Sequence, residues 1–537
     1  MIHKTYATLQ ELYEASTALF SERPAFSLYR QEQLTYAGFA RRVEAFAALY
    51  KQHGLVSGDK VALLSQNMPN WPAAYFAAVT SGMVIVPILP DFSPAEVEMI
   101  VRHSDAKALV VSEKQYVKIS DGLAGELNAV IKADDLSLFR NRTDVEYQWR
   151  DEPVQPDDLA AIIYTSGTTS SPKGVMLSHK NLCTQLSMVL TIQDVQEWDV
   201  FLSLLPLSHS YECSLGMLLP FMNGASVVYL SKAPTANVLL PVLKEIRPTI
   251  ILSVPLIIEK LFKNAILPKF TSGKWMPKLY GLAPGRKALH RVAGRKLKTM
   301  FGGRVRFFGV GGAKLDPTVE RFLYEAKFPY AIGYGLTETA PLLAGCHPSL
   351  VAPGTTGPAM RGVDLRIDNP HPVTGEGEIV AQGPNIMLGY YKNPEATADA
   401  FTADGWFRTK DLGIFRRDGY LSIKGRLGNM ILGASGENIY PEEIEHVINS
   451  YSFVTDSLVK EEKGRLVALV EFNREELEKK YGVWKEELET KIEQLQDELL
   501  AYVNARVNRF SRLSVVYVQG QAFEKTPTHK IKRFLYH

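Results

Sequence analysis

Short apolar runs alternate with longer amphipathic stretches from about residue 35 to residue 230. The runs read VALLS, VIVPIL, ALVVS, AAIIYT and ASVVYL, and each has the length and composition of a buried strand. The stretches between them carry apolar residues at helical spacing. Strands that alternate with helices are typical of a mainly parallel sheet covered by helices, so the pattern predicts the α/β class.

One helix start can be read residue by residue in the segment SPAEVEMI, which follows the run VIVPIL. Ser93 can cap the helix, Pro94 suits its first position, and Glu96 completes a capping box. We therefore expect VIVPIL to lead through this cap into a helix, and that helix to lead into the strand ALVVS.

The pattern changes towards the carboxyl terminus. A second alternating block, with the strand candidates TIILSVP and VRFFGVGG, covers roughly 231–350 and continues the same large domain. Residues from about 354 to 425 are rich in Gly, Pro and short β-like runs (VDLRI, GEIVA, YLSIKG). This composition predicts a small antiparallel or barrel-like subdomain.

Another unit begins near residue 429 with the helix PEEIEHVI, which has Pro441 at its first position. The apolar face of this helix would consist of Ile444, Val447 and Ile448. A charged helical stretch follows from residue 475 to about residue 508. The preceding segment KGRLGN is the best linker candidate, because Gly425 and Gly428 permit backbone rotation that other residues resist.

The composition limits the class of protein and the compartment in which it works. A chain of 537 residues is too long for one hydrophobic core, and 46% hydrophobic with 22% charged residues is ordinary for globular proteins. Cys183, Cys213 and Cys346 lie far apart without metal or disulfide spacing, which favours a reducing cytoplasm. The amino terminus lacks an apolar signal core, and no stretch approaches the ~20 apolar residues of a membrane span, so any membrane contact should be peripheral.

Positive charge is concentrated between Lys260 and Arg306, where thirteen Lys and Arg residues occur without one Asp or Glu. Such a surface suits anionic lipid at the inner membrane surface, an acidic protein or a nucleotide phosphate. It can equally be a solvated face. The formal net charge is only +2, and we expect no nucleic-acid partner.

A loop suited to a polyphosphate follows the run LAAII and reads YTSGTTSSPKGVMLSH from Tyr164 to His179. Hydroxyl and backbone N–H groups can donate to phosphate oxygens, and a lysine adds positive charge. The candidate phosphate contacts are Thr165, Ser166, Gly167, Thr168, Thr169 and Lys173. Many clusters of Ser, Thr and Gly are ordinary loops. The lysine is followed by Gly174 and Val175, so the loop is not a G-x-x-x-x-G-K-[ST] P-loop.

The segment GYGLTETA, residues 333–340, gathers an aromatic ring, glycines, threonines and a carboxylate. Tyr334 could stack on a base, and Glu338 could ligate magnesium, which prefers oxygen donors. An exposed loop carboxylate is the commoner role of such a glutamate. The role of this segment can be inferred only together with the other motifs of the chain.

Those other motifs are LPLSHSYE, FFGVGGAKL, GWFRTKDLG, YLSIKGR and TPTHKIKR. Together with the two segments above, they resemble the adenylate-forming acyl-CoA synthetase superfamily over nearly the whole chain, and look most like long-chain fatty acyl-CoA synthetases. The resemblance implies a large amino-terminal domain, residues 1–427, with two mainly parallel helix-covered sheets and the β-rich subdomain. It also implies a small mobile α+β domain, residues 428–537.

The reaction that this resemblance implies has two halves. A fatty carboxylate attacks the α-phosphate of ATP in the presence of Mg²⁺, which gives acyl-AMP and pyrophosphate. A thiol then attacks the acyl carbon and AMP leaves. The thiol belongs to coenzyme A or to the phosphopantetheine of an acidic acyl carrier protein.

The matching positions imply roles for single residues. Thr165 and Glu338 would position Mg²⁺, Lys173 and the loop hydroxyls would hold the β and γ phosphates, and Lys530 would stabilise charge on the reacting oxygens. Adenine would lie between the backbone of residues 311–313 and the ring of Tyr334. The remaining nucleotide contacts would come from Gly311, Gly312, Ala313, Gly335, Thr337, Asp411, which would bind the ribose, and Arg426.

Five further positions carry expectations of their own. Ser435 and Gly436 would line the pantetheine tunnel, and Gly428 would be the hinge, where the family usually has Asp or Lys. His209 either closes the acyl pocket near the nucleotide or is an ordinary packed histidine. Ser170 stands where the family usually has glycine, which would loosen the loop if its backbone needs a positive φ.

The stretch around His209, FLSLLPLSHSYECSLGMLLPFM, is almost continuously apolar, and no Asp is placed to bind an amino group. Each buried methylene contributes about 0.8 kcal/mol, so an apolar tunnel favours medium- or long-chain fatty acids. An aryl or short-chain acid–CoA ligase and an acyl–acyl carrier protein synthetase stay open. So do a non-catalytic acyl- or nucleotide-binding protein and a membrane-recruited interaction protein.

Overall fold

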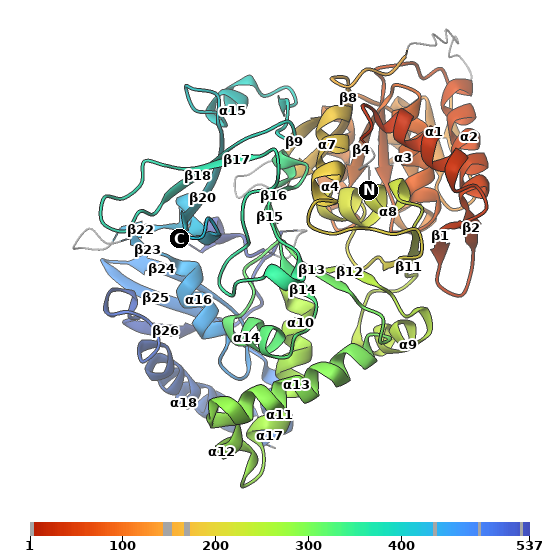
Figure 1. Ribbon diagram of the computed structural model, residues 1–537. Helices are drawn as coiled ribbons and strands as arrows, with labels where there is room; N and C mark the ends of the chain where they lie inside the picture. The colour runs from red at the N-terminus through yellow and green to blue at the C-terminus, as the bar shows by residue number, and fades with distance from the viewer. Residues whose placement is uncertain are drawn as a thin grey trace.

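The computed structural model describes residues 5–142, 153–165, 172–432, 438–481, 485–526 and 530–536 (Figure 1). Within these residues the chain forms two large sheets covered by helices, a smaller antiparallel sheet and a carboxy-terminal α+β unit. This arrangement confirms the predicted α/β class with two mainly parallel sheets.

The first large sheet has eight strands in the order β19-β9-β8-β4-β3-β5-β6-β7, with parallel pairing from β8 to β6 and antiparallel pairing at both edges. The strands are β3 (Lys60–Leu64), β4 (Val84–Ile88), β5 (Ala106–Val111), β6 (Ala129–Lys132), β7 (Leu138–Asn141), β8 (Leu159–Thr165), β9 (Lys173–Ser178) and β19 (Gly389–Tyr390). Val61 and Leu63 are buried on one face, and Ala62 and Leu64 on the other. The continuous run VALL is therefore a strand covered on both faces.

Helices fill both faces of this sheet. The core that it shares with the second sheet includes α1 (Leu9–Leu19), α2 (Tyr36–Gln52), α3 (Asn70–Thr80), α7 (His179–Val189) and α8 (Leu219–Met222). The outer face is covered by α4 (Pro94–His103) and α6 (Asp121–Glu126), with the short α5 (Glu113–Tyr116) between them. Ser93 caps α4 and forms a capping box with Glu96, as the sequence predicted.

The second large sheet has seven strands in the order β14-β13-β12-β10-β11-β1-β2, all parallel except the β1–β2 pair. The strands are β1 (Pro24–Leu28), β2 (Gln33–Thr35), β10 (Val200–Leu202), β11 (Ser226–Tyr229), β12 (Ile250–Ser253), β13 (Phe307–Val310) and β14 (Tyr330–Ile332). Its outer face is covered by α9 (Ala236–Ile246), α13 (Ala283–Met300) and α14 (Pro317–Glu325).

The strand β11 corrects one grouping made from the sequence. Its run ASVVYL was grouped with the strands of the first alternating block, but β11 pairs with β10 and with β1, in the second sheet. The local pattern specifies a buried strand without specifying its neighbours, because pairing partners are distant in sequence.

The β-rich region forms a four-stranded antiparallel sheet, in the order β17-β18-β20-β21. Its strands are β17 (Asp364–Asp368), β18 (Gly377–Gln382), β20 (Phe407–Phe415) and β21 (Leu421–Arg426), and α15 (Pro394–Asp399) precedes β20. A hairpin of β15 (Tyr334–Gly335) and β16 (Leu342–Ala344) leads into this region. The predicted antiparallel subdomain is confirmed.

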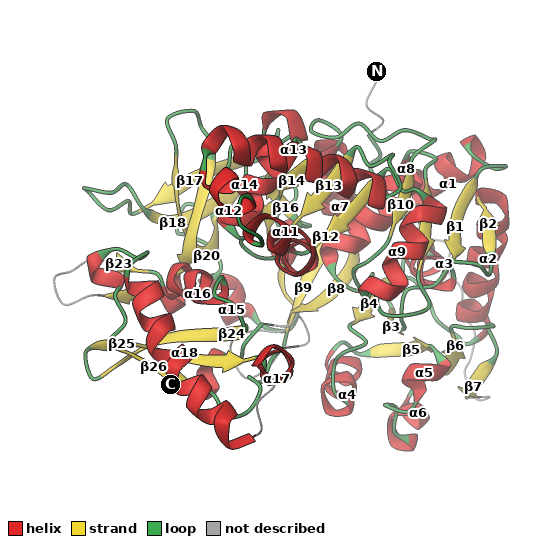
Figure 2. Ribbon diagram, turned by 90° about the horizontal axis from the view of Figure 1, so that it is seen from below, coloured by secondary structure: helices red, strands yellow, loops and turns green. Residues whose placement is uncertain are grey.

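The carboxy-terminal unit, residues 431–536, has its own hydrophobic core, and the figures show it at one end of the molecule (Figures 1 and 2). It consists of β22 (Ile431–Leu432), β23 (Asn438–Ile439), α16 (Pro441–Asn449), β24 (Val454–Glu462), β25 (Arg465–Phe472), α17 (Arg474–Tyr481), α18 (Lys485–Asn504) and β26 (Val515–Val518). Across the described residues we find no helix with the length and apolar character of a membrane span.

Candidate active site

Asp411 on β20 lies at the centre of a buried polar group. Its carboxylate accepts a hydrogen bond from the Tyr334 hydroxyl (2.8 Å) and pairs with Nε of Arg426 (2.8 Å), which lies opposite it on β21. Only 5% of Asp411 is exposed, and burial raises its pKa, while Arg426 and the hydrogen bond from Tyr334 oppose that rise. Such a carboxylate is a fixed acceptor that suits the paired hydroxyls of a ribose.

The ends of β13 and β14 lie side by side next to this group. Gly311 N donates to Ser253 O (3.1 Å), and Gly333 N donates to Val310 O (2.9 Å). Gly312 has a φ of +85°, in the left-handed region that favours glycine. The segment FFGVGG therefore ends its strand in a turn that only glycine adopts without strain.

Two glycines here allow close approach of other groups. A Cβ on Gly311 would lie 3.2 Å from the ring of Tyr211, and a Cβ on Gly335 would lie 1.7 Å from the carbonyl oxygen of Pro341. Any side chain at Gly335 would displace the backbone beside Tyr334. At these two positions the space of a side chain is therefore taken by Tyr211 and by Pro341.

A second cluster joins the end of the β8–β9 pair to the 3₁₀ turn of residues Thr337–Thr339. Thr165 pairs with Lys173 across the two strands, and Lys173 Nζ lies 5.2 Å from the centre of the Tyr390 ring. The Tyr390 hydroxyl donates to Oε1 of Glu338 (2.9 Å). The sequence did not single out Tyr390, because only the pairing of β19 with β9 brings it to this site.

The donor types of this cluster fit a magnesium ion that arrives with phosphates. The Thr165 hydroxyl and the Glu338 carboxylate are oxygen donors, which magnesium prefers. Among the described residues, no group of three or more His, Cys, Asp or Glu side chains could hold a metal. A magnesium ion here would therefore take further oxygens from a substrate, as it commonly does with phosphates.

Lys530 reaches both clusters from the carboxy-terminal unit. Its main chain is fixed by Thr526, whose N–H donates to Lys530 O (2.7 Å) and whose hydroxyl accepts from Lys530 N (3.2 Å). The side chain is solvent-accessible, yet the surrounding protein lowers its pKa, and Arg426 lowers it further while Asp411 and Glu338 raise it. The charges of Asp411 and Glu338, one from each cluster, therefore both act on this lysine.

His209 lies on the nucleotide side of the site. Burial, and then the positive charge of Lys530, lower the pKa of His209 to about 4, so the imidazole is neutral at pH 7. His209 is not part of the wall of the apolar pocket, whereas Tyr211, two residues later, is. The sequence analysis named His209 in this segment and did not name Tyr211, which is the wall residue.

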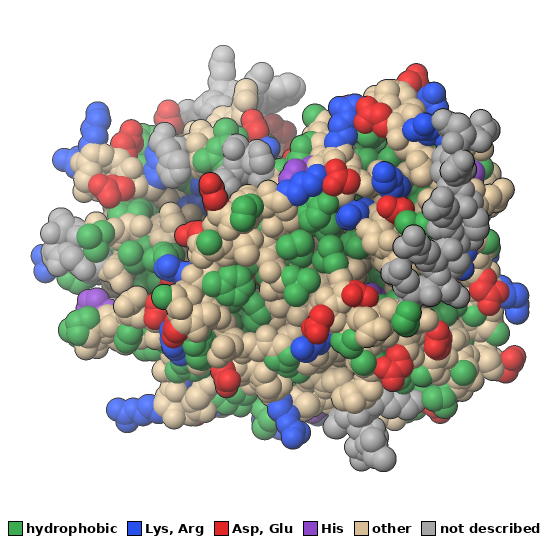
Figure 3. Space-filling view, turned by 90° about the horizontal axis from the view of Figure 1, so that it is seen from above, with side chains coloured by type: hydrophobic (Ala, Val, Ile, Leu, Met, Phe, Trp, Pro, Cys, Tyr) green, Lys and Arg blue, Asp and Glu red, His purple; other side chains and the backbone are tan. Residues whose placement is uncertain are grey.

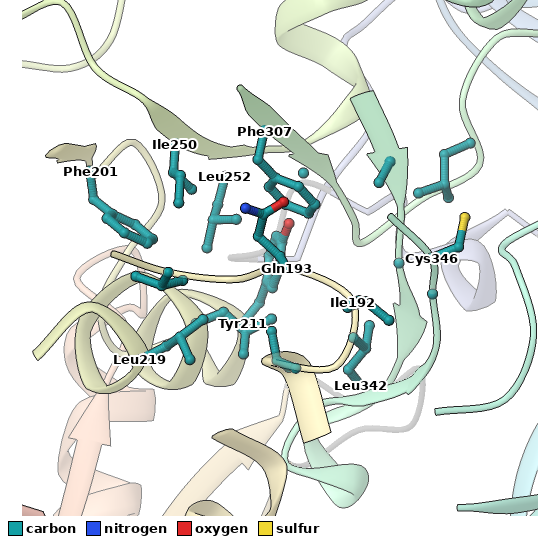
Figure 4. A pocket seen from close by; sticks show the side chains of 18 residues that line it. Ile192, Gln193, Phe201, Tyr211, Leu219, Ile250, Leu252, Phe307, Leu342 and Cys346 are labelled. Atoms are coloured by element: carbon teal, nitrogen blue, oxygen red, sulfur yellow. The ribbon is translucent and has the colours of Figure 1, made fainter. Parts of the chain in front are cut away.

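The apolar pocket lies between the second sheet and the π-helical turn of residues Glu212–Leu218 (Figure 4). The space that it encloses is about 40 Å³, well below the about 300–1,000 Å³ of small-molecule sites, so a long acyl chain enters only if the wall side chains move apart. Its wall includes Phe201, Leu215, Leu219, Ile250, Leu252 and Phe307. Gly309 and Gly333 also line it, so the pocket borders Gly311 and Tyr334.

Several residues named from the sequence lie outside the described residues or outside the two clusters. Ser166, Gly167, Thr168, Thr169, Ser170, Ser435 and Gly436 fall outside the described residues. Gly428 lies in the 3₁₀ turn Leu427–Asn429 directly after β21, and a Cβ there would meet no atom within 4 Å. The Thr337 hydroxyl accepts a hydrogen bond from Ser210 (3.4 Å), and Ala313 follows the turn at Gly312.

Comparison with known proteins places the chain in a family. A family model described as AMP-binding enzyme matches residues 13–391. Fatty acyl-CoA synthetase A of Dictyostelium discoideum is 27% identical over 93% of this chain and 83% of its own, and long chain acyl-CoA synthetase 6, peroxisomal, of Arabidopsis thaliana is 31% identical over 78% and 65%. A solved structure of o-succinylbenzoate CoA synthetase from Bacillus subtilis, in complex with its acyl-adenylate intermediate, superposes with a TM-score of 0.77 at 22% identity, covering 98% of both chains. The chain belongs to the AMP-binding enzyme family, as its motifs predicted.

Proposed function

We propose that this enzyme activates a medium- or long-chain fatty acid with ATP and transfers the acyl group to coenzyme A, releasing AMP and pyrophosphate. The observation that carries the proposal is the buried group of Tyr334, Asp411 and Arg426 beside an apolar pocket, with the charge of Asp411 acting on Lys530. The curated relatives are named fatty acyl-CoA and long-chain acyl-CoA synthetases, which supports the same substrate class.

The first half-reaction brings two anions together. Two like charges 4 Å apart repel by about 4 kcal/mol at an effective dielectric near 20, so the site must supply positive charge. Lys173 holds the β and γ phosphates, and Lys530 stabilises the charge that develops on the reacting oxygens. Thr165 and Glu338 would hold magnesium, which would supply further neutralisation of the phosphates.

The remaining residues orient the substrates. The backbone of residues 311–313 and the Tyr334 ring hold adenine, while Asp411, fixed by Arg426, accepts from the ribose hydroxyls. The acyl chain lies in the pocket, and its carboxylate emerges beside Gly309 and Gly333. The carboxylate attacks the α-phosphate, and pyrophosphate departs. The thiol of coenzyme A then attacks the acyl carbon, and AMP departs.

We also propose that the two domains move relative to each other. Residues 1–427 form the substrate-binding domain, and residues 428–537 form a lid that turns at Gly428, where open space surrounds the backbone. Ser435 and Gly436 line the thiol tunnel. The protein works in the cytoplasm, and coenzyme A is the acceptor, with an acyl carrier protein as the alternative.

The role of Lys530 is tested by measuring pyrophosphate release with Mg-ATP across a panel of fatty acids. Thioester formation is measured with coenzyme A and, separately, with a holo acyl carrier protein. We expect Lys530→Ala to reduce pyrophosphate release by roughly a hundredfold or more, which is typical when a charge-stabilising group is lost. Lys532→Ala, two residues away, is the matched control and should retain activity. Full activity in Lys530→Ala would contradict the assigned role.

A second proposal concerns the basic stretch of residues 260–306, which includes α10 (Pro255–Leu261), α11 (Leu267–Thr271), α12 (Met276–Gly281) and α13. Trp275 is 80% exposed, Leu282 64% and Leu279 44%. Lys269, Lys274, Lys278 and Lys287 form no ion pair with a described residue. We name Trp275, Met276, Leu279 and Leu282, with Lys274 and Lys278, the Trp275 face.

We propose that the Trp275 face contacts the surface of an anionic membrane, where free fatty acids partition. Exposed apolar side chains beside unpaired lysines suit a lipid surface, since the lysines meet anionic headgroups and the apolar side chains enter the interface. An acidic carrier protein would account for the lysines but not for an exposed Trp, Met and Leu cluster. The same binding experiment distinguishes the membrane from the carrier protein as the partner.

A further inference from the structure

Gln193, in the loop after α7, carries a buried amide that lines the apolar pocket (Figure 4). Only 3% of the residue is exposed. Its Nε2 donates to the main-chain oxygen of Asp194 (2.9 Å), and Nη2 of Arg306 donates to the same oxygen (2.5 Å). Rotating the amide by half a turn would set two acceptor oxygens against each other, so this orientation is fixed. Oε1 is then left without a hydrogen-bond partner among the described residues.

An unpaired carbonyl oxygen is unusual in such surroundings. Buried polar atoms are nearly always hydrogen-bonded, and an unpaired one is unfavourable. The wall near Gln193 is otherwise apolar except for Tyr211 and Cys346. Burial raises the pKa of Tyr211 and raises that of Cys346 to about 11, so both groups stay neutral. An unsubstituted alkyl chain offers no donor to Oε1.

Gln193 lies near the start of β13, because Arg306 donates to the main-chain oxygen of its neighbour Asp194. Arg306 directly precedes β13, whose first residue Phe307 pairs with Ile250 at the start of β12. Gly311, next to the group of Asp411 and Tyr334, lies four residues after Phe307. At the rise per residue of a strand, the distance from Phe307 to Gly311 is about 13 Å. The part of a substrate that meets Gln193 is therefore the distal part of the acyl chain.

A water molecule satisfies the carbonyl less well than a substrate group does. A buried water needs two to four polar partners, and this part of the wall is mostly apolar. An alkyl chain long enough to fill the pocket would also displace that water and leave Oε1 unpaired again. A donor carried by the substrate itself avoids both difficulties.

We propose that Gln193 recognises a hydroxyl group on the distal part of the acyl chain, so that the enzyme prefers hydroxylated fatty acids over unsubstituted acids of the same length. The substrate O–H donates to Oε1, while the rest of the chain packs against the apolar wall. This inference rests on the proposed function, because it names the substrate class of that same site.

The test compares kcat/KM for pyrophosphate release with unsubstituted acids and with acids of equal length that carry one hydroxyl at successive distal positions. We expect the best hydroxy acid to exceed its unsubstituted counterpart by about tenfold or more, the effect of one hydrogen bond to a buried group. Gln193→Leu should remove this preference and raise the rate with the unsubstituted acid. Gln193→Met serves the same purpose if the leucine variant does not fold.

Gln196→Leu is the matched control, because Gln196 lies in the same loop, bonds the Asp194 side chain and does not line the pocket. It should keep the preference. Equal or better rates with unsubstituted acids in the native enzyme, or a preference that survives Gln193→Leu, overturn the inference and leave the proposed function intact. Absence of pyrophosphate release with every acid overturns both.

Discussion

The protonation of Lys530 depends on the residue beside it, and this can be measured. Lys530 acts in its charged form, and its pKa lies below the usual lysine value because of desolvation by the surrounding protein and then the charge of Arg426. Activity is therefore present below this lowered pKa and is lost as the pH rises through it. Arg426→Gln removes a positive charge, so the pKa of Lys530 should rise and the alkaline limb of the pH profile should move to higher pH.

The profile to record is that of kcat/KM for ATP, which reports groups of the free enzyme. Arg426→Gln will also lower the absolute rate, since Arg426 holds Asp411, but the position of the limb does not depend on that loss. Arg416→Gln, which removes an exposed arginine paired with Asp418, should leave the limb in place. A limb that stays or moves to lower pH in Arg426→Gln would show that Arg426 does not set the charge of Lys530.

Single residues were predictable where local chemistry requires one residue type. The capping box of Ser93 and Glu96 is such a case. Tyr390 and Gln193 were not predictable in this way. Tyr390 meets Glu338 only through strand pairing, and Gln193 matters because of an oxygen that the fold leaves unpaired.

At the scale of elements, α16 holds the tail that carries Lys530. Glu445 on α16 accepts a hydrogen bond from Val459 N (2.6 Å) and pairs with the guanidinium of Arg533, three residues after the lysine. Arg533 also donates to Val459 O (3.3 Å). Glu445 is buried, and burial raises its pKa to about 7. The Glu445–Arg533 pair therefore holds the tail of residues 530–536 against α16 and β24. This makes Arg533 a positioning residue for Lys530.

We expect Arg533→Met to lower pyrophosphate release by about tenfold or more, since a small displacement of a charge-stabilising group has a large effect on rate. Thioester formation from supplied acyl-adenylate should change much less, because that step does not bring a carboxylate to a triphosphate. Arg533→Lys should recover part of the loss. If both half-reactions fell equally, the pair would only stabilise the unit, and the positioning role would be wrong.

Elements were predictable where periodicity is strong, and their partners were not. The runs VALLS and VIVPIL are strands, and PEEIEHVI is a helix with Ile444 and Ile448 buried. The strand β1 was missed, although Phe26 is buried in the shared core, because its run PAFSL is interrupted by Pro and Ser and lacks the continuous apolar character of VALLS. Which strands share a sheet depends on contacts between residues far apart in sequence.

At the scale of the whole molecule, charge is unevenly distributed. On the face shown in Figure 3, basic and acidic side chains are interspersed, in keeping with a net charge of +2. The stretch of residues 260–306 departs from this mixture, because its cations greatly outnumber the acids that pair with them from elsewhere, Asp199, Asp316 and Glu325. Sequence alone revealed the charge, whereas the exposed apolar side chains among the lysines became visible only in the fold.

If the Trp275 face binds lipid, the protein should float with vesicles that contain anionic lipid and should stay behind with neutral vesicles. Each lysine near an anionic surface contributes about 1 kcal/mol, so Lys274→Ala with Lys278→Ala should weaken binding by roughly thirtyfold. Trp275→Ser should weaken it at high salt as well, where the electrostatic part is screened. Lys107→Ala with Lys114→Ala, two exposed lysines on the first sheet's side, is the matched control. Pyrophosphate release with dissolved fatty acid should be the same in all these variants, since the face lies apart from the site. Flotation that ignores lipid charge, or that survives loss of both lysines and Trp275, would remove the face from any role in recruitment.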